Sequence, residues 1–589
     1  MTRKAPFHIA TLNMWPFDSQ YPCKRLQDIA DQAYDYIIVG GGTAGCALAS
    51  KLSESPETTV LMLEKGPIKD SYQSRIPLAS VANGIYTKRQ NSSLGSRPVP
   101  ILSAETLGGN SRINAMIYTR GTPAYYNQWA RTHPDWSWVN VEPYFRKVEN
   151  SINLCQNREL ESNIYPFLRK SASALGLPLG HDINRPDSPA MGYFDLHLTV
   201  DSKQHRHSAV RAYLPKEVAV RRRARLHICT GVVASRLHLD ASTGLVKGVF
   251  VQSSQAKQTD SKTSPRKPTL VKARREVILA AGAIGTPKIL QLSGVGPRLV
   301  LERVGIPVVR HLPGVGSNLG DHCLFPVHVQ VPVHETLQQL QASILKRAKH
   351  AVLYAVAGKG WLRSAVDRAI LLCTSHFDEE KGAVLATEAA DDGETLPDVE
   401  IMVVPIGSLP ELYPGKSMIT LQTCLIQPKS TGTIEITSPD PGVDARIQLN
   451  ILSDPSDWQV ARKACRFALA LAEHFIHQSG YPSEARVFAG PGSVGAREWK
   501  EGDWRVVSDQ EIDTYIGMYV GSGFHLTSSC RMGREEDGGV VDSQLRVHGF
   551  KNLRIADASV LPCVPPGHPM APTYMISERC ADFIKDGRN

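Results

Sequence analysis

The first clear pattern of apolar positions lies near the N-terminus, in two short runs separated by a helical stretch. Residues 36–39 form a continuous apolar run of the kind found in buried parallel strands, and residues 59–63 form a second one. The small and apolar residues at 43–52 between them favour a helix. This order of strand, helix and strand predicts a βαβ unit, the building block of a doubly wound α/β sheet.

Later apolar runs predict two groups of strands. The first group continues the α/β pattern, whereas the second suits an antiparallel sheet. In chain order the predicted strands are residues 226–230, 245–252, 276–281, 398–404, 418–426 and 432–436. We therefore expect an α/β chain with a nucleotide-type domain and a second, α+β domain built around an antiparallel sheet.

The helical regions are interrupted by proline. Residues 123–148 are expected to be mostly helical, with breaks at Pro134 and Pro143. Residues 457–477 suit an amphipathic helix. Thr286 is expected to cap a helix whose first position is the proline that follows it.

Composition narrows the class of protein without changing the predicted fold. The 589 residues are 42% hydrophobic and 21% charged, which is typical of a globular protein with more than one domain. The net charge of +9 is spread along the chain, so no nucleic-acid partner is expected. Because the chain shows neither a membrane-spanning apolar run nor a secretory signal, we expect a cytoplasmic protein with no membrane partner. The eleven scattered cysteines predict free thiols and no metal site.

The chemistry of the first unit follows from three glycines and one acidic residue. Gly40, Gly42 and Gly45 give the spacing G-x-G-x-x-G directly after the first strand, and Glu64 ends the second strand. Gly40 permits a tight turn, Gly42 lets the backbone approach a pyrophosphate, and Gly45 lets the helix lie close to the sheet. The helix N-terminus offers N–H groups to phosphates, and Glu64 can accept hydrogen bonds from ribose hydroxyls. The unit therefore predicts a dinucleotide site.

Five further motifs follow the first unit, which contains IIVGGGTAG and Glu64. In chain order they are LGGNSRINAMIYTRG, GAIGTPKILQLSGVGP, LPGVGSNLGDH, HLTSSCRMG and LRIADASVLP…GHPMAPTYMISERCAD. In this order they resemble the glucose–methanol–choline oxidoreductases, which hold FAD. The resemblance implies a discontinuous Rossmann-like FAD-binding domain and a second domain that covers the flavin. The implied divisions are an N-terminal extension at 1–33, an FAD-binding domain at 34–155, 220–322 and 530–589, and a substrate-binding domain at 156–219 and 323–529.

The resemblance also implies which residues contact FAD. Val233 or Ala234 would hold the adenine through the backbone, and these two alternatives stay open. The implied set is Gly40, Gly42, Thr43, Ala44, Gly45, Glu64, Lys65, Gly109, Asn114, Ala115, Met116, Ile117, Val233, Ala234, Asp557, Ala558, Pro569 and Met570. Ile113 stands where some family members carry a histidine bonded to flavin, so we expect non-covalent FAD. A basic residue usual before Leu107 is replaced by Ser103-Ala104-Glu105, and a phosphate or loop contact there is expected to differ.

Two histidines are the candidate catalytic residues. His525 follows a flexible Gly-Ser-Gly-Phe stretch, and His568 lies in a proline-rich turn expected to be exposed. The resemblance implies that His525 is the base and His568 its hydrogen-bonding partner, with exchanged or shared roles left open. A neutral imidazole suits this work because its pKa lies near neutral pH. Phe524 is expected to line the substrate pocket.

The predicted reaction is the oxidation of a small or medium-sized alcohol, aryl and allylic alcohols included, in the biosynthesis of a small metabolite. Hydride would pass to flavin N5, and oxygen or another acceptor would reoxidise the flavin. The alternative is a non-redox lyase or cyclase that keeps FAD and uses the same histidines for acid–base chemistry. The exact substrate and the oligomeric state are left open by the sequence.

Overall fold

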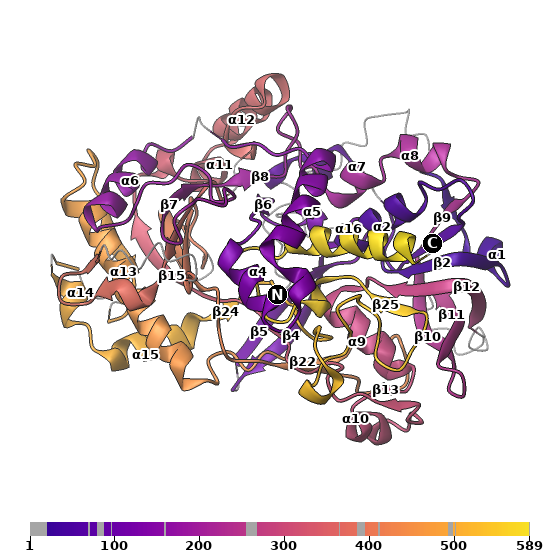
Figure 1. Ribbon diagram of the computed structural model, residues 1–589. Coiled ribbons are helices and arrows are strands. Elements are labelled where there is room, and N and C mark those ends of the chain that lie inside the picture. Colours follow the sequence, from indigo (N-terminus) through magenta and orange to yellow (C-terminus); the bar gives the residue numbers. More distant parts are fainter. Residues whose placement is uncertain are drawn as a thin grey trace, which may run out of the picture.

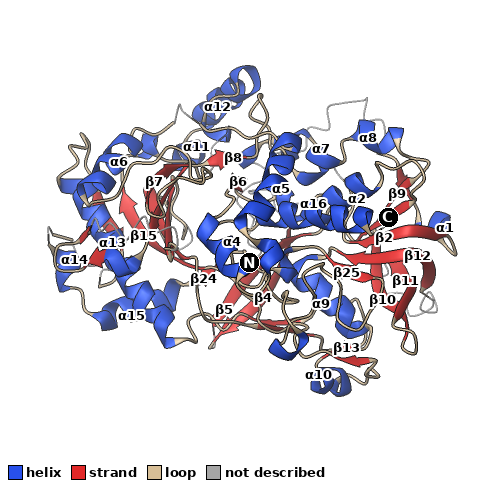
Figure 2. Ribbon diagram, viewed as in Figure 1, coloured by secondary structure: helices blue, strands red, loops and turns tan. Residues whose placement is uncertain are grey.

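The computed structural model describes most of the chain, and its secondary structure is shown in Figures 1 and 2. The described residues are 21–68, 71–78, 87–95, 97–157, 161–254, 268–363, 366–385, 395–409, 413–492, 499–500 and 502–587. Most of the expected N-terminal extension, residues 1–20, lies outside them. The expected domain boundaries stay a prediction.

An eight-stranded, mainly parallel sheet forms one half of the molecule (right half of Figure 1). Its central strands β2 (Ala33–Val39) and β3 (Val60–Glu64) pair in parallel, and helix α2 (Thr43–Leu52) connects them. The remaining strands are β1 (Cys23–Lys24), β9 (Leu226–Thr230), β10 (Val232–Asp240), β11 (Leu245–Ser253), β12 (Thr269–Leu279) and β25 (Leu553–Ile555). The βαβ prediction and the strands expected at 226–230, 245–252 and 276–281 are confirmed.

Strand β25 and helix α16 (Met570–Asp586) bring the C-terminal end of the chain back to this sheet. β25 pairs in parallel with β12, and α16 packs directly against α2. Figure 1 shows these two helices side by side beside the sheet. The α/β half is therefore assembled from segments far apart in the sequence, as expected.

A seven-stranded antiparallel sheet forms the other half of the molecule. Its strands are β7 (Gly192–Asp195), β15 (Cys323–Gln330), β16 (Arg368–Leu372), β19 (Val399–Val404), β20 (Met418–Leu425), β23 (Arg486–Ala489) and β24 (Gly521–Ser522). Side chains alternate between its two faces. Ile401 and Leu421 belong to the apolar cluster that includes helix α13 (Pro455–His477), whereas Met402 and Cys424 pack toward Met116. The expected α+β half with an antiparallel sheet, and its long amphipathic helix, are confirmed.

The strand expected at 432–436 does not join this sheet. Strand β21 (Thr433–Glu435) pairs with β22 (Arg446–Gln448) in a separate two-stranded sheet. The side chain of Gln291 holds it there, because its amide nitrogen donates to the Ile434 carbonyl at 2.9 Å and its oxygen accepts from the Ile436 N–H at 2.8 Å. The apolar pattern therefore predicted the strand correctly but could not show which strand it pairs with.

The helix break expected at Pro143 is also wrong. Helix α5 (Trp138–Ser151) runs through Pro143, although the break at Pro134 is real because only a short 3₁₀ turn (Pro134–Trp136) lies there. A proline inside a helix removes one backbone hydrogen bond. The carbonyl that loses its partner belongs to Val139, which is 76% exposed, so water can replace the missing donor.

Thr286 does not cap its helix. Helix α9 (Gly282–Leu292) begins four residues earlier, and Thr286 lies inside it. Its hydroxyl accepts from the Ala281 N–H at 3.2 Å and donates to Asp557 at 2.6 Å. Contact with a distant carboxylate explains why the position carries threonine.

Some features of the fold were not in the sequence prediction. Strands β4 (Thr87–Leu94) and β5 (Arg97–Ala104) form a hairpin, and Val99 and Ile101 join the apolar cluster of the antiparallel half.

Among the described residues, no helix combines the length and apolarity that crossing a bilayer requires.

Gly45 is one of the positions where this fold tolerates a side chain least. A Cβ atom at Gly45 would lie 1.9 Å from the Gly40 carbonyl oxygen, whereas one at Gly42 would lie 3.8 Å from its nearest neighbour. We expect Gly45→Ala to destabilise the protein by about 1–3 kcal/mol, as overpacking does, and to lower its unfolding midpoint in urea. Gly42→Ala is the matched control and should unfold within experimental error of the wild type. Equal midpoints for the two variants would contradict the close packing of α2 on β2.

Candidate active site

The glycine turn between β2 and α2 forms an open cradle at a helix N-terminus. Gly40 has φ +110°, and a Cβ atom there would meet the Ala280 carbonyl oxygen at 2.3 Å, so only glycine fits. Gly42 is the N-cap of α2 and has no side chain to occupy the first N–H groups. Thr43 is partly exposed at the start of the helix, and Ala44 is buried behind it.

A second glycine motif lies directly against the first. The Gly108 N–H donates to the Gly41 carbonyl at 2.7 Å, and a Cβ atom at Gly109 would come within 2.7 Å of the Gly42 Cα. Gly109 also has φ +53°. The structure therefore brings together two glycine segments that lie far apart in the sequence, and the backbone alone lines the point where they meet. This arrangement fits the pyrophosphate of a dinucleotide.

Glu64 stands at the end of β3 and holds the glycine turn. Its two carboxylate oxygens accept from the N–H groups of Gly41 at 2.8 Å and Gly66 at 2.7 Å. Burial raises the pKa of Glu64 to about 7, while the backbone donors act in the opposite direction. A carboxylate has about four lone-pair sites, so the ribose contact expected of Glu64 remains compatible with these bonds. Lys65 forms an ion pair with Glu105 at 2.6 Å, and its expected cofactor contact stays a prediction.

Val233 and Ala234 lie near this same edge of the sheet. They are in β10, which begins next to the end of β9, and the Gly231 N–H donates to the Gly66 carbonyl at 3.4 Å. Ala234 is buried, and Val233 is partly exposed. The backbone of either residue could contact an adenine at this position, so the alternatives Val233 and Ala234 both stay open.

Asn114 and Met570 meet at the other end of the predicted cofactor path. The Asn114 amide nitrogen lies 3.1 Å from the Met570 sulfur, and its oxygen accepts from the Met116 N–H at 3.1 Å. Met116 has φ +66°, Ala115 is exposed, and Ile117 begins a short buried strand. The sequence analysis missed Arg206, a fully buried arginine that donates to the Asn114 oxygen at 2.7 Å.

Asp557, Ala558 and Pro569 hold loops around this end of the path. The Asp557 carboxylate accepts from the N–H groups of Gly282 at 2.9 Å and Ser559 at 2.8 Å. The Ala558 carbonyl accepts from the Ser528 N–H at 3.1 Å, and Pro569 is the N-cap of α16. The side chain of Asp557 thus faces α9, and the expected cofactor contacts of these residues stay a prediction.

His525 and His568 lie side by side. Nε2 of His525 is 3.1 Å from Nδ1 of His568, and the ring planes are 83° apart. His568 is 7% exposed, so the expectation of an exposed turn is wrong. Thr119 accounts for the difference, because its hydroxyl accepts from the His568 N–H at 2.9 Å and draws the turn inward.

Two buried residues that the sequence analysis did not single out extend this pair. His322 Nδ1 lies 2.9 Å from His525 Nδ1, and Glu400 has both carboxylate oxygens 3.3 Å from His568 Nε2. His322 ends the motif LPGVGSNLGDH, to which the sequence analysis gave no catalytic role. Glu400 did carry a signal, since it is an acidic residue inside the buried apolar strand β19, where a carboxylate needs a partner.

Asp321 fixes the backbone that carries His525. Its carboxylate accepts from the His525 N–H at 2.8 Å and from the hydroxyl of Ser522, whose oxygen in turn accepts from the Phe524 N–H at 2.9 Å. Burial raises the pKa of Asp321 to about 7. Phe524 has φ +62° and is 40% exposed, which leaves its ring free to line a pocket.

The electrostatic environment favours neutral His525 and His322. Burial lowers the pKa of His525 well below its ordinary value, and the charges of His568 and His322 act in the same direction. Burial, followed by the charge of His568, lowers the pKa of His322 to about 4. A histidine that stays neutral at pH 7 can accept a proton, as a general base must.

The antiparallel sheet presents an apolar face to this region. Met402 and Cys424 share an apolar cluster with Met116 and Ile117, both predicted to lie along FAD. Glu400 is on the same face, two residues from Met402 in β19. The histidine pair therefore lies where the two halves of the molecule meet.

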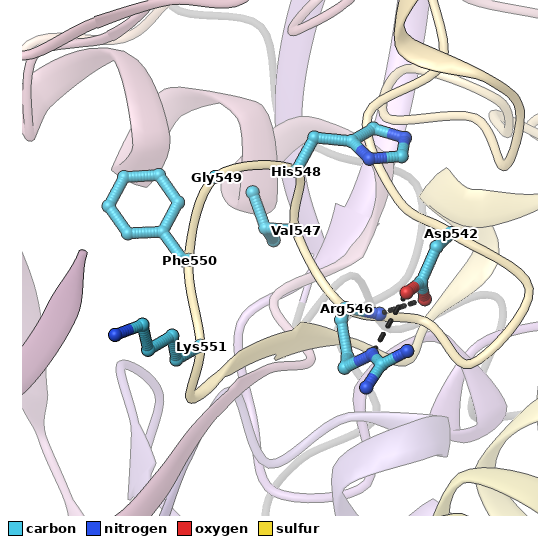
Figure 3. Close-up of a pocket in the computed structure, with 7 residues that line it drawn as sticks. All are labelled: Asp542, Arg546, Val547, His548, Gly549, Phe550 and Lys551. Carbon is cyan, nitrogen blue, oxygen red and sulfur yellow. Dashed lines mark hydrogen bonds and ion pairs between the residues drawn. The ribbon is translucent and has the colours of Figure 1, made fainter.

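A surface hollow seen in Figure 3 is separate from this site. It is lined by residues of the 542–551 segment, and an ion pair between Asp542 and Arg546 at 2.9 Å crosses it. None of the predicted site residues lines it. We assign it no role in the reaction.

The comparisons with known proteins agree with the fold. Two family models, each described as GMC oxidoreductase, match residues 34–324 and 428–577, respectively. The chain is 30% identical over 583 residues to an oxygen-dependent choline dehydrogenase of Chromohalobacter salexigens, covering 94% of this chain and 95% of that protein. It is 31% identical to an oxygen-dependent choline dehydrogenase of Vibrio vulnificus, covering 94% of each chain.

A solved structure shows the same architecture. An FAD-dependent oxidoreductase from Chaetomium thermophilum superposes with a TM-score of 0.79 at 25% identity, covering 94% of this chain and 99% of that chain. The glycine cradle, Glu64 and the Asn114–Met570 contact fit FAD. The chain therefore belongs to the GMC oxidoreductase family, as an FAD-dependent oxidoreductase that acts on CH–OH groups.

Proposed function

We propose that this protein oxidises a small or medium-sized alcohol, with His525 as general base and His568 as the hydrogen-bond donor to the same oxygen. The observation that carries the proposal is the 3.1 Å contact between His525 Nε2 and His568 Nδ1. An alcohol oxygen placed at this contact would be within hydrogen-bond reach of both nitrogens. The remaining contacts of the two rings indicate which of them takes the proton.

The partners of His322 support His525 as the base. His322 Nε2 lies 3.0 Å from the Pro565 carbonyl oxygen, which can only accept, so His322 carries its proton on Nε2. Nδ1 of the neutral His322 ring is then an acceptor. His525 Nδ1, 2.9 Å away, therefore donates to it, and the lone pair of His525 is left on Nε2. The basic nitrogen of His525 is the one that faces His568.

His568 carries two protons in this arrangement. Its Nε2 lies 3.3 Å from each oxygen of Glu400 and donates to that carboxylate. Its Nδ1 faces the lone pair of His525, a contact that is favourable only when Nδ1 is protonated as well. Burial raises the pKa of Glu400, but the charge of His568 and its hydrogen bond outweigh burial, so the net shift of this pKa is downward. Glu400 is thus the counterion of an imidazolium.

These protonation states suit alcohol oxidation. The hydroxyl proton of the substrate passes to His525 Nε2 while the C–H bond on the adjacent carbon breaks. The imidazolium of His568 donates to the same oxygen and stabilises the negative charge that develops on it. When bound, FAD supplies the acceptor for the hydride at N5. General-base assistance of this kind contributes about 10²–10⁴-fold to a rate.

The apolar face of the antiparallel sheet supports a substrate with an apolar body. Met402 and Cys424 line the side of the sheet that faces the predicted flavin segment, next to Glu400. We propose aryl or allylic alcohols as candidate substrates, in the biosynthesis of a small metabolite, with oxygen as the electron acceptor. Two curated relatives are oxygen-dependent dehydrogenases, which supports oxygen in that role.

Substitution of His525 tests the base directly. We expect His525→Ala to keep the visible absorption of bound flavin and to lose at least about 10²-fold in the rate of flavin bleaching on anaerobic mixing with alcohol. His334→Ala, at a histidine that is 58% exposed, is the matched control and should bleach at the wild-type rate. A bleaching rate for His525→Ala within about twofold of wild type would rule out the assignment. Product formed without bleaching would instead indicate the non-redox alternative.

Substitution of Glu400 tests the carboxylate beside His568. Glu400→Gln keeps the size of the side chain but removes the negative charge 3.3 Å from His568 Nε2, so we expect kcat to fall, and Glu400→Asp should restore it in part. The acid limb of kcat/KM in the wild type should stay below pH ~6.5, the ordinary pKa of histidine, because the pKa of His525 is lowered. A kcat for Glu400→Gln equal to that of the wild type would contradict this role of Glu400.

Acid precipitation tests the mode of FAD attachment. We propose non-covalent FAD, because Ile113 offers no nucleophilic atom at the position where some family members bond flavin. We expect all of the yellow colour to remain in the supernatant after the protein is precipitated with acid. Flavin absorption that stayed with the pelleted polypeptide would show a covalent link.

A further inference from the structure

Helix α12 (Ile344–Ala357) presents its apolar side to solvent. Leu345, Val352 and Val356 follow one another at helical spacing along one face, with exposed fractions of 83%, 62% and 82%. Ile344 beside them is 79% exposed. A surface helix of a globular protein normally turns such a face toward the core. On α12 this apolar face is turned toward solvent instead.

Contacts on the opposite side of the helix fix this orientation. His350 and Tyr354 lie one turn apart and are buried, and the Tyr354 hydroxyl donates to the Gln204 carbonyl at 2.9 Å. The guanidinium of Arg347 donates to the Leu340 carbonyl at 3.1 Å. In Figures 1 and 2 the helix projects from the edge of the molecule, so its outer face is accessible.

The same segment is strongly basic. Between residues 343 and 363 it contains Lys346, Arg347, Lys349, Lys359 and Arg363, and no acidic residue. By helical position Lys346 and Lys349 lie at the flank of the apolar face, and both are exposed. An apolar stripe bordered by lysines is the pattern of a helix that lies in a membrane interface.

We propose that the outer face of α12 docks on a membrane surface that contains anionic lipids. The aliphatic side chains would enter the boundary between headgroups and acyl chains, and the lysines would contact the phosphates. Such peripheral docking needs no membrane-spanning segment. The sequence analysis expected no membrane partner because the chain has no membrane-spanning apolar run. That expectation does not bear on a helix that binds the membrane from its surface.

Charge argues against a second copy of the chain as the occupant. A two-fold dimer brings the same patch of each subunit together. Pairing through α12 would place Lys346 and Lys349 of one copy close to those of the other, without an acidic residue on the helix to balance them. Like charges placed together in an interface cost several kcal/mol. An anionic surface offers the complementary charge instead.

Co-sedimentation of the FAD-loaded, full-length protein with lipid vesicles tests the proposal. We expect binding to vesicles of phosphatidylcholine and phosphatidylglycerol in equal amounts, and at least about tenfold weaker binding to phosphatidylcholine alone. In about 1 M NaCl, where the Debye length is roughly 3 Å, this difference should shrink. Two double variants, Lys346→Glu/Lys349→Glu and Leu345→Ser/Val356→Ser, should each bind the anionic vesicles at least about tenfold more weakly.

Matched variants elsewhere on the surface control for general effects. Lys272→Glu/Lys551→Glu changes two exposed lysines, and Val139→Ser/Leu299→Ser changes side chains that are 76% and 75% exposed. Both should bind as the wild type does, with unchanged unfolding midpoints in all variants. Equal binding of the wild type to the two vesicle types, or equal losses in the controls, would overturn the proposal. Self-association lost only in the α12 variants would also overturn it, because the occupant would then be a second copy.

Discussion

The buried hydrogen-bonded series from Glu400 through His568 and His525 to His322 is the constraint on which the site depends. Each member comes from a different segment, and successive side chains approach within 3.3 Å. A buried carboxylate or imidazole without a partner would cost several kcal/mol, so these segments are stable only when they meet correctly. The two sheets must therefore hold a fixed relative position for the series to form. In the proposed mechanism, the same contacts decide which nitrogen of His525 is basic.

The opposite end of the site depends on backbone rather than on side chains. Two glycine segments meet at Gly42 and Gly109, where any side chain would either collide or occupy the approach to the helix N-terminus. Glu64 anchors this turn through two backbone N–H groups. Hydrogen bonds within the protein thus hold the cradle in place, and its N–H groups and helix dipole suit the pyrophosphate of a dinucleotide.

The charged residues of the interior and those of the α12 surface have different surroundings. Inside, Glu400 and His568 lie in contact beside His525, and a proton on one ring alters the chemistry of the neighbouring ring. On α12, Lys346 and Lys349 flank an exposed aliphatic stripe that the described residues leave uncovered. We propose that the first arrangement serves the reaction and that the second binds anionic lipid.

The sequence alone determined the parts that depend on local pattern. Apolar runs at 36–39 and 59–63 gave the βαβ unit, because buried parallel strands have a short-range signature, and glycine spacing located the turn. The family resemblance pointed to His525 and His568. The tertiary structure decided what depends on distant partners: that His322 and Glu400 join the pair, that Thr286 bonds Asp557 instead of capping, and that residues 433–435 leave the main sheet. Periodicity shows which side of an element is apolar but not which element covers that side, so the exposure of the apolar face of α12 among the described residues could be seen only in the folded chain.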